Sequence, residues 1–315
     1  MKIAVLIPAY NAARFLPQCL DSVLVQQVPN LEIRCCDDGS TDGTRTVLQG
    51  YAARFPNVRV VTQANAGVVA ARNRLLDELP ADIEAFSFLD ADDYVAPGMY
   101  AKLAEALERT GSDVAECEWD GEERVLDDMS VFLLRRTAPG RWINVINKLY
   151  RRSSAGKIRF RPGLAFEEDY FFNYEMHAAI RRKVLVPGSF YTYRTNSASA
   201  NGSLNLTRYF DSSSRRLRLS RDVFLKAGRI PQNLEASFRR ELAKDLYRMC
   251  LRKNLKKNAD TILRRRLFVA AGELIREFES DGSIDIRGLN LVQRALFALC
   301  RHGCLALARL VSFLT

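Results

Sequence analysis

The amino-acid sequence predicts an α/β fold, a mainly parallel sheet flanked by helices, followed by a helical C-terminal extension. Along residues 1–109, short apolar runs alternate with helical patterns, which is typical of β-α-β units. Acidic residues follow two of these runs directly. Beyond residue 203 only helical patterns occur. We therefore divide the chain into two predicted parts, 1–203 and 204–315.

Four strands are predicted in the first part. The run 1–7 is apolar apart from Lys2, as expected for a strand buried on both faces. The other strands are predicted at 31–36, 58–62 and 86–89. Because helical crossovers connect the strands, we expect them to pair in parallel and to end at one edge of the sheet.

Helices are predicted between and after these strands, at 13–27, 42–54, 68–79 and 99–109. Ser40 or Thr41 can cap the second of them. The region 113–202 is less regular, with short strands predicted at 114–117, 183–186 and 190–193 and a helix at 170–180. Further helices are predicted at 206–228, 232–253, 259–279 and 289–314.

Charge is unevenly distributed along the chain. Residues 1–203 hold 24 Lys and Arg against 26 Asp and Glu, a net charge of −2. Residues 204–315 hold 23 against 11, a net charge of +12. A neutral first part with a basic, apolar second part favours an anionic surface as partner, and not nucleic acid.

The seven cysteines are not spaced as a disulfide framework, and residues 1–7 lack the long apolar run of a signal peptide. An odd number of cysteines in this setting indicates reduced thiols in the cytoplasm. Cys35 and Cys36 are adjacent in a predicted strand, so we expect them to point to opposite faces of the sheet.

Two motifs at strand ends suggest a nucleotide site. Pro8-Ala9-Tyr10-Asn11 ends the first strand, and the Tyr10 ring can stack on a nucleobase, although it can equally be an ordinary strand-end aromatic. Asp38 ends the second strand and can accept a hydrogen bond from a base N–H, which would favour uracil. The alternative for Asp38 is a turn, since Asp-Gly-Ser is good turn chemistry.

Glycine-rich phosphate loops are absent from the sequence, which contains neither GxGxxG after the first strand nor GxxxxGK[ST]. A bound diphosphate would therefore need a cation. Asp90-Ala91-Asp92 follows the run 86–89, and its two carboxylates can reach a ribose hydroxyl and a divalent metal. The alternative is a solvated acidic turn.

Residues 63–67 and 71–73 place amide side chains, a glycine and Arg72 at a strand-to-helix junction. Arg72 can face a base or a phosphate. Alternatively, it is a surface arginine paired with Asp77 or Glu78.

Together these motifs resemble those of family-2 glycosyltransferases of the GT-A fold. The resemblance covers about residues 1–203 and includes PAYN, DDGSTDGT, QANAG, ARN and FLDADD. It continues as in bacterial polysaccharide and lipopolysaccharide members, with Asn147-Lys148-Leu149-Tyr150-Arg151, Phe166-Glu167-Glu168-Asp169, and Tyr193-Arg194 with Ser197.

The resemblance implies an inverting transfer of a sugar from a nucleotide sugar, usually a UDP-sugar, to a hydroxyl of a glycan or lipid-linked acceptor. It assigns Asp92 to the metal and Asp169, beside Glu168, to the general base that takes the acceptor proton. On its own, Asp169 could be an ordinary acid at a helix N-terminus. The residues that the resemblance assigns to the nucleotide are Pro8, Ala9, Tyr10, Asp38, Asn65 and Arg72 for the nucleoside, with Asp90 and the adjoining Ala91 at the ribose.

Histidine is scarce, with His177 and His302 the two in the sequence. His177 lies in the predicted apolar helix 170–180, where packing is its expected role. Without a histidine ligand, an ion should rest on Asp92, diphosphate oxygens and water, which suits Mn²⁺ or Mg²⁺ and not zinc.

The predicted helix 289–314 is apolar but carries Arg294, Arg301 and Arg309 on one stripe. It has no uncharged stretch of the roughly 20 residues that span a bilayer. We expect an interfacial helix with arginines at headgroups, peripheral at the inner face of the cell membrane. The alternative is a helix packed on the protein's own body or on a second subunit of a homo-oligomer.

Two other functions remain open from the sequence. A sugar-nucleotide nucleotidyltransferase would share the α/β domain and the metal, but Pro8-Ala9-Tyr10-Asn11 offers neither its glycine-rich loop nor its basic residue. A non-enzymatic basic adaptor for membrane or RNA would not need Asp92 and Asp169.

Overall fold

The computed structural model describes residues 1–127, 144–164, 168–194, 206–226, 239–240, 242–244, 246–247 and 261–302. The chain divides into two compact units, one formed by 1–162 and 168–197 and the other by 163–167 and 198–315. The boundary expected at 203 lies outside the described residues. The two units are described separately below.

The first unit is built on a mixed sheet of eight strands within the described residues, in the order β3-β2-β1-β4-β8-β6-β9-β7. Strands β3, β2, β1 and β4 are mutually parallel, as the sequence predicts. Beyond them, β8 pairs antiparallel with both β4 and β6, and β7 pairs antiparallel with β9. The strands span Ile3–Ala9 (β1), Leu31–Asp37 (β2), Val58–Thr62 (β3), Ala85–Phe88 (β4), Val114–Trp119 (β6), Arg124–Asp127 (β7), Lys148–Arg151 (β8) and Arg182–Pro187 (β9).

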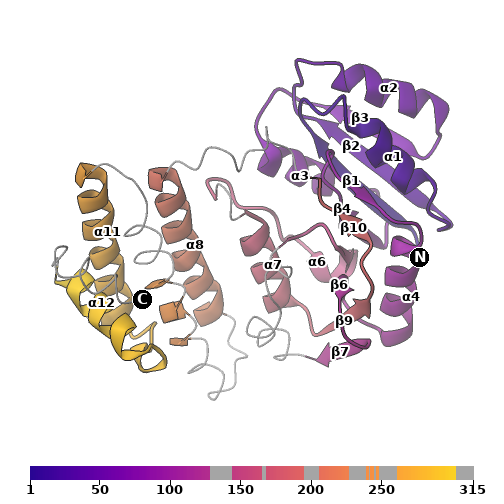
Figure 1. Ribbon diagram of the computed structural model, residues 1–315. Helices are drawn as coiled ribbons and strands as arrows, with labels where there is room; N and C mark the ends of the chain where they lie inside the picture. The colour runs from indigo at the N-terminus through magenta and orange to yellow at the C-terminus, as the bar shows by residue number, and fades with distance from the viewer. Residues whose placement is uncertain are drawn as a thin grey trace. The chain divides into compact units, whose positions relative to one another are not determined.

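Helices cover both faces of this sheet (Figure 1). One core combines Val5 and Ile7 of β1 with apolar residues of α1 (Leu16–Leu24), α2 (Thr44–Arg54) and α4 (Met99–Thr110). The other combines Ala4 and Leu6 with residues of α3 (Val68–Asp77), α6 (Arg152–Ala155) and α7 (Glu168–Ala179). The alternation follows from the pleat, which sends successive side chains to opposite faces. Cys35 and Cys36 divide in the same way, which confirms the expectation.

The expected cap of α2 by Ser40 or Thr41 is wrong. In the fully described segment 1–127, α2 begins at Thr44 after Gly43 and has no side-chain cap. Asp42 accepts a hydrogen bond from the Thr44 amide at 2.9 Å instead. Ser40 and Thr41 contact Asn11, through Ser40 Oγ at 3.1 Å and the Thr41 amide at 2.8 Å. Their role is therefore to join the loops that follow β1 and β2.

A second, two-stranded sheet pairs β5 (Tyr94–Val95) antiparallel with β10 (Tyr191–Thr192). The segment 190–193 was expected to be a strand, whereas β5 was not. The backbone pairing continues where the Ala96 amide donates to the Phe190 carbonyl at 2.7 Å. This small sheet joins the acidic loop after β4 to the segment that follows β9.

The second unit is helical, with α8 (Leu206–Lys226), α11 (Thr261–Ser280) and α12 (Leu291–Arg301). These agree with three of the predicted helices, whereas most of 232–253 and all of 303–314 lie outside the described residues. None of the described helices has the length and apolarity needed to cross a bilayer. On α12, Leu296, Phe297 and Cys300 are buried.

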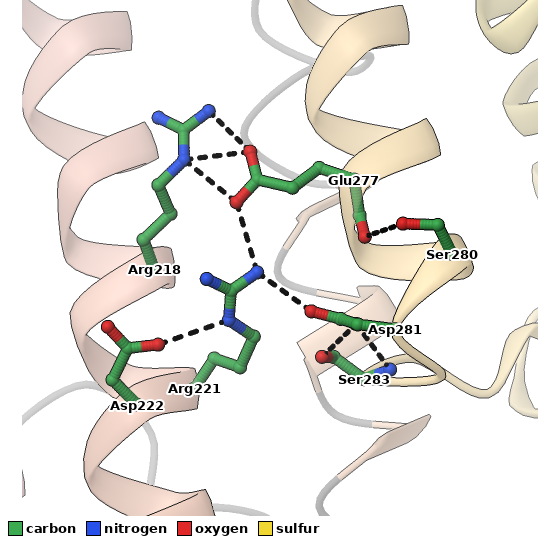
Figure 2. Close-up of polar contacts among 7 residues, drawn as sticks. All are labelled: Arg218, Arg221, Asp222, Glu277, Ser280, Asp281 and Ser283. Carbon is green, nitrogen blue, oxygen red and sulfur yellow. Dashed lines mark hydrogen bonds and ion pairs between the residues drawn. The ribbon is translucent and has the colours of Figure 1, made fainter.

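Ion pairs join α8 to α11 and to the turn after it (Figure 2). Arg218 binds Glu277 through both Nε and Nη2, at 2.9 and 2.7 Å. Arg221 bridges Glu277 and Asp281, each at 3.0 Å, and its guanidinium lies over the Phe278 ring. A network of this kind fixes the alignment of the two helices, because bidentate arginine pairs are geometrically specific.

Candidate active site

The ends of β1 and β2 bring the first predicted nucleoside residues together. Pro8 and Ala9 are buried in β1, opposite Cys36 and Asp37 of β2, and the Asp38 amide donates to the Ala9 carbonyl at 2.9 Å. Tyr10 is 50% exposed. Its ring is therefore available for stacking, on a backbone that is held by two strands.

Asp38 is buried and holds the loop 63–67. Its Oδ1 accepts hydrogen bonds from Gln63 Nε2 at 2.7 Å and from the Ala66 amide at 2.9 Å, and its Oδ2 accepts from the Gly67 amide at 2.8 Å. An ionised carboxylate offers about four acceptor positions, so one remains for a ligand. Asp38 thus fixes the entry to α3 as well as standing at the predicted base pocket.

Asn65 lies on this loop, exposed and against Gly39. A Cβ at Gly39 would approach the Asn65 amide nitrogen to 2.6 Å, and Gly39 has a φ of +71°. Both facts demand glycine in the Asp-Gly-Ser turn. The turn and the loop therefore pack closely enough to set the position of Asn65.

Arg72 connects the acidic motifs. It is buried on α3, and its Nη2 pairs with Asp90 Oδ1 at 2.9 Å while its Nη1 pairs with Asp169 Oδ1 at 2.5 Å. Glu168 lies 3.7 Å from Nη1. The alternative of a surface arginine is wrong, because Asp77 and Glu78 pair with Arg159 and Arg74 instead. Within the described residues, the buried Nε has no hydrogen-bond partner.

Asp169 lies in the first turn of α7, directly after Glu168, at which the helix begins. Burial raises the pKa of Asp169, Arg72 opposes the rise, and Asp90 adds to it. Burial and the charge of Asp169 likewise raise the pKa of Glu168. A carboxylate with a raised pKa is a stronger base while it remains ionised at neutral pH. The two acids differ in their contacts, since Asp169 has the shorter bond to Arg72.

The acidic loop after β4 is tied to the rest of the unit by Asp93. The Asp93 amide donates to the Asp90 carbonyl at 3.0 Å, which closes a turn around Ala91 and Asp92. The Asp93 carboxylate accepts from the Tyr191 hydroxyl and, at 2.7 Å, from the Arg194 amide. Burial raises the pKa of Asp93 to about 6. Asp93 is not among the residues predicted for the site, although its place in the Asp-Ala-Asp-Asp run was the signal available.

Asp92 is the carboxylate at which the sequence predicts a divalent cation. Asp92 is partly buried, and Asp90 is paired with Arg72. No group of three His, Cys, Asp or Glu side chains converges as a metal site in the part of the chain that the structure describes. An ion at Asp92 would take its other ligands from diphosphate oxygens and water, which Mg²⁺ tolerates well.

Comparison with known proteins identifies the class. The family model for glycosyl transferase family 2 matches residues 4–185. The uncharacterised glycosyltransferase YibD of Escherichia coli K12 is 30% identical over 294 aligned positions, which cover 84% of this chain and 83% of YibD. The chondroitin synthase of E. coli is 37% identical over 95 residues, 30% of this chain and 14% of the synthase.

The fold has solved counterparts. The structure of S. aureus TarS residues 1–349 has a TM-score of 0.74 at 21% identity, covering 99% of this chain and 90% of that one. The same TarS fragment in complex with UDP-GlcNAc has a TM-score of 0.72 at 20% identity. The fold is therefore GT-A, with a helical C-terminal part.

This chain belongs to glycosyltransferase family 2. Of the three functions that the sequence left open, the family selects sugar transfer, and the protein is an enzyme.

Proposed function

We propose that this glycosyltransferase moves a sugar from a UDP-sugar, with inversion, to a hydroxyl of a glycan or lipid-linked acceptor in cell-surface polysaccharide or lipopolysaccharide synthesis. The observation that carries the proposal is the Arg72 bridge. It joins the carboxylate predicted for the ribose, Asp90, to the carboxylate predicted for the acceptor, Asp169. One guanidinium thus sets the donor and acceptor ends of the site relative to each other.

The chain's own groups supply the acceptor chemistry. An attacking alcohol must lose its proton as it bonds to the anomeric carbon, and Asp169 takes that proton on a carboxylate oxygen. Tyr10, Asp38 and Asn65 hold the nucleoside, with Pro8 and Ala9 forming the pocket floor. A Mn²⁺ or Mg²⁺ ion at Asp92 would supply charge stabilisation for the departing diphosphate.

Two similar proteins support the proposed donor nucleotide and the proposed kind of acceptor. TarS has been solved with UDP and with UDP-GlcNAc, which favours UDP as the nucleotide here. Chondroitin synthase is named for making a polysaccharide, which favours a glycan acceptor. The basic second unit suits an acceptor held at an anionic membrane surface.

The test has a binding arm and a turnover arm. UDP titrated calorimetrically should bind in the presence of Mn²⁺ and lose most of its affinity with EDTA, and GDP should bind more weakly. Donor turnover across UDP-, GDP- and dTDP-sugars should then be highest for a UDP-sugar.

Asp169→Asn should lower that turnover about 10²- to 10⁴-fold and leave UDP binding unchanged. Glu168→Gln is the matched control. If Glu168→Gln is the inactive variant, or if GDP binds as well as UDP, the corresponding assignment is wrong.

A further inference from the structure

Three charged residues are buried together on neighbouring strands of the sheet. Glu116 lies on β6, Lys148 on β8 and Lys183 on β9, and they are 6%, 0% and 2% exposed. Glu116 Oε2 pairs with Lys148 Nζ at 3.4 Å and makes a closer pair with Lys183. Glu116 carries a single negative charge, which its closer partner Lys183 neutralises. The burial of Lys148 therefore needs another explanation, because a buried charge without compensating contacts is costly.

Lys148 is bonded mainly to a turn. Its Nζ donates to the Asn144 carbonyl at 2.5 Å and to Asn147 Oδ1 at 2.7 Å. Asn147 in turn donates from Nδ2 to the Cys117 carbonyl at 2.9 Å and accepts the Cys117 amide at 3.0 Å. The two hydrogen bonds of Lys148 Nζ and its ion pair with Glu116 are the contacts of the buried ammonium group. Lys148 therefore fixes the segment 144–147 to β6.

The same turn reaches the candidate base. The Val145 amide donates to Asp169 Oδ2 at 3.5 Å, while Arg72 holds Oδ1. We propose that Lys148 is a positioning residue for sugar transfer: it holds the turn 144–147 so that the Val145 amide orients the Asp169 carboxylate toward the acceptor. This inference rests on the proposed role of Asp169 as the base.

The electrostatics agree with this geometry. Burial raises the pKa of Asp169, and Asp90 adds to it, whereas Arg72, the Val145 amide and the charge of Lys148 lower it. Glu168 is the remaining acid beside it and shares Arg72. Burial itself lowers the pKa of Lys148 to about 8, with Glu116 opposing and Lys183 reinforcing the effect. Removing Lys148 should therefore raise the pKa of Asp169 as well as release the turn.

The experiment compares Lys148→Met with Lys183→Met in the full-length enzyme. Both substitutions remove a buried lysine from the same glutamate, but in the described part of the chain the partners of Lys183 are Glu116 and, at 3.4 Å, His177, and not the turn 144–147. The measurements are turnover of UDP-GlcNAc with Mn²⁺ as a function of pH, UDP affinity, and hydrogen exchange of the peptide that covers 144–148.

Lys148→Met should lower kcat about 10- to 100-fold, as a small misplacement of a catalytic group can do. It should move the acid limb of the kcat profile to higher pH, accelerate exchange in 144–148 and leave UDP affinity unchanged. In the Lys183→Met enzyme, kcat, the acid limb of its pH profile and the hydrogen-exchange rate of 144–148 should stay near the wild-type values.

Either of two results overturns the inference. One is equal hydrogen exchange of 144–148 in both variants, and the other is a Lys148→Met enzyme whose kcat and acid limb match those of the wild type. The proposed function is tested separately. If the Asp169→Asn enzyme is active, Asp169 is not the general base, whatever the result for Lys148. If UDP-GlcNAc is not turned over, the same comparison is made with whichever of the UDP-, GDP- or dTDP-sugars the wild-type enzyme turns over.

Discussion

At the scale of single residues, Arg72 is the group on which the site depends. Burial would lower the pKa of its guanidinium, but Asp169, Asp90 and Glu168 raise it, so the side chain stays charged. The Phe160 ring lies 5.2 Å from the guanidinium carbon and adds a cation–π contact. The planar fork of arginine suits this bridge, because its two Nη atoms are held in fixed directions and each bonds one carboxylate.

Arg72→Met should therefore destabilise the protein. It leaves Asp90 and Asp169 without their partner, and breaking a buried pair in this way costs about 3 kcal/mol. Arg74→Met is the matched control on the same helix, since its pair with Glu78 is exposed and contributes about 0.3–0.5 kcal/mol. Urea denaturation of both variants measures the difference. Equal losses of stability would show that the buried bridge contributes no more than a surface pair.

The pH dependence of transfer should report Asp169. Because burial and Asp90 raise its pKa above the ordinary 3.8, protonation should remove the base at a pH higher than for a solvated aspartate. As the pH rises through the pKa of Asp169, activity should increase because the base becomes ionised. Over the same pH range the free energy of unfolding should fall, because a raised pKa means that the folded protein holds this proton more tightly than the unfolded chain does. A profile of kcat against pH checks the first statement, and an acid limb at or below 3.8 contradicts it.

The sequence predicted the polar groups of the candidate site but not the contacts between them. Asp90 and Asp92 stand in a recognisable run after a buried strand. Asp169, one of the partners of Arg72, is by contrast 97 residues further along the chain. Such a pair depends on the sheet bringing α3 and α7 together, which no local pattern encodes. The same holds for Asp93, whose partners lie on the segment after β9.

At the scale of elements, the alternation of strand and helix patterns decided what could be predicted. The parallel strands β1 to β4 stand between predicted helices and were predicted, although β4 has four residues. Strands β5, β7 and β8 have two or four residues and lack this regular context, and they were not predicted. Lys148 is the first residue of β8. The strand that was not predicted is therefore the one that positions Lys148.

Packing of α11 against α12 should reverse the usual effect of a glycine-to-alanine substitution. A Cβ at Gly272 would lie 2.6 Å from the Cys300 carbonyl oxygen, on backbone that cannot yield easily. Gly272→Ala should therefore destabilise the protein, typically by about 1–3 kcal/mol. Gly50→Ala in α2 meets no atom within 4 Å and should stabilise by about 0.5–1 kcal/mol.

Thermal unfolding of the two variants provides the comparison. Because each places alanine in a helix, the difference in propensity cancels and the close approach remains. A rise in Tm for both variants would mean that α12 can shift away from α11 without loss.

At the scale of the whole molecule, the uneven charge remains the main evidence for a membrane surface. The structure changes how that proposal is tested. Leu296, Phe297 and Cys300 of α12 are buried, and Arg301 pairs with Glu279 at 3.2 Å, so packing accounts for this part of the predicted interfacial helix. A truncation near Gly288 would remove these buried residues, whereas one after His302 keeps them.

Full-length protein should co-sediment with vesicles that contain phosphatidylglycerol and much less with phosphatidylcholine alone. Each basic residue near the surface contributes about 1 kcal/mol, and added salt should weaken the attraction. Protein that ends at His302 lacks the apolar residues 303–315 and Arg309 and should bind more weakly. If vesicle binding depends neither on the charge of the lipid nor on the salt concentration, the electrostatic proposal is contradicted.

Cys35 and Cys36 provide a natural pair of conformational reporters. They are neighbours in β2 yet belong to the cores on opposite faces of the sheet, and both are fully buried. Burial raises their pKa values to about 12 and about 11, so neither thiol reacts until its face opens. Alkylation followed by mass spectrometry would time the opening of each face independently, without an introduced label. Unequal rates at these adjacent positions would show that the two helical layers detach from the sheet as separate events.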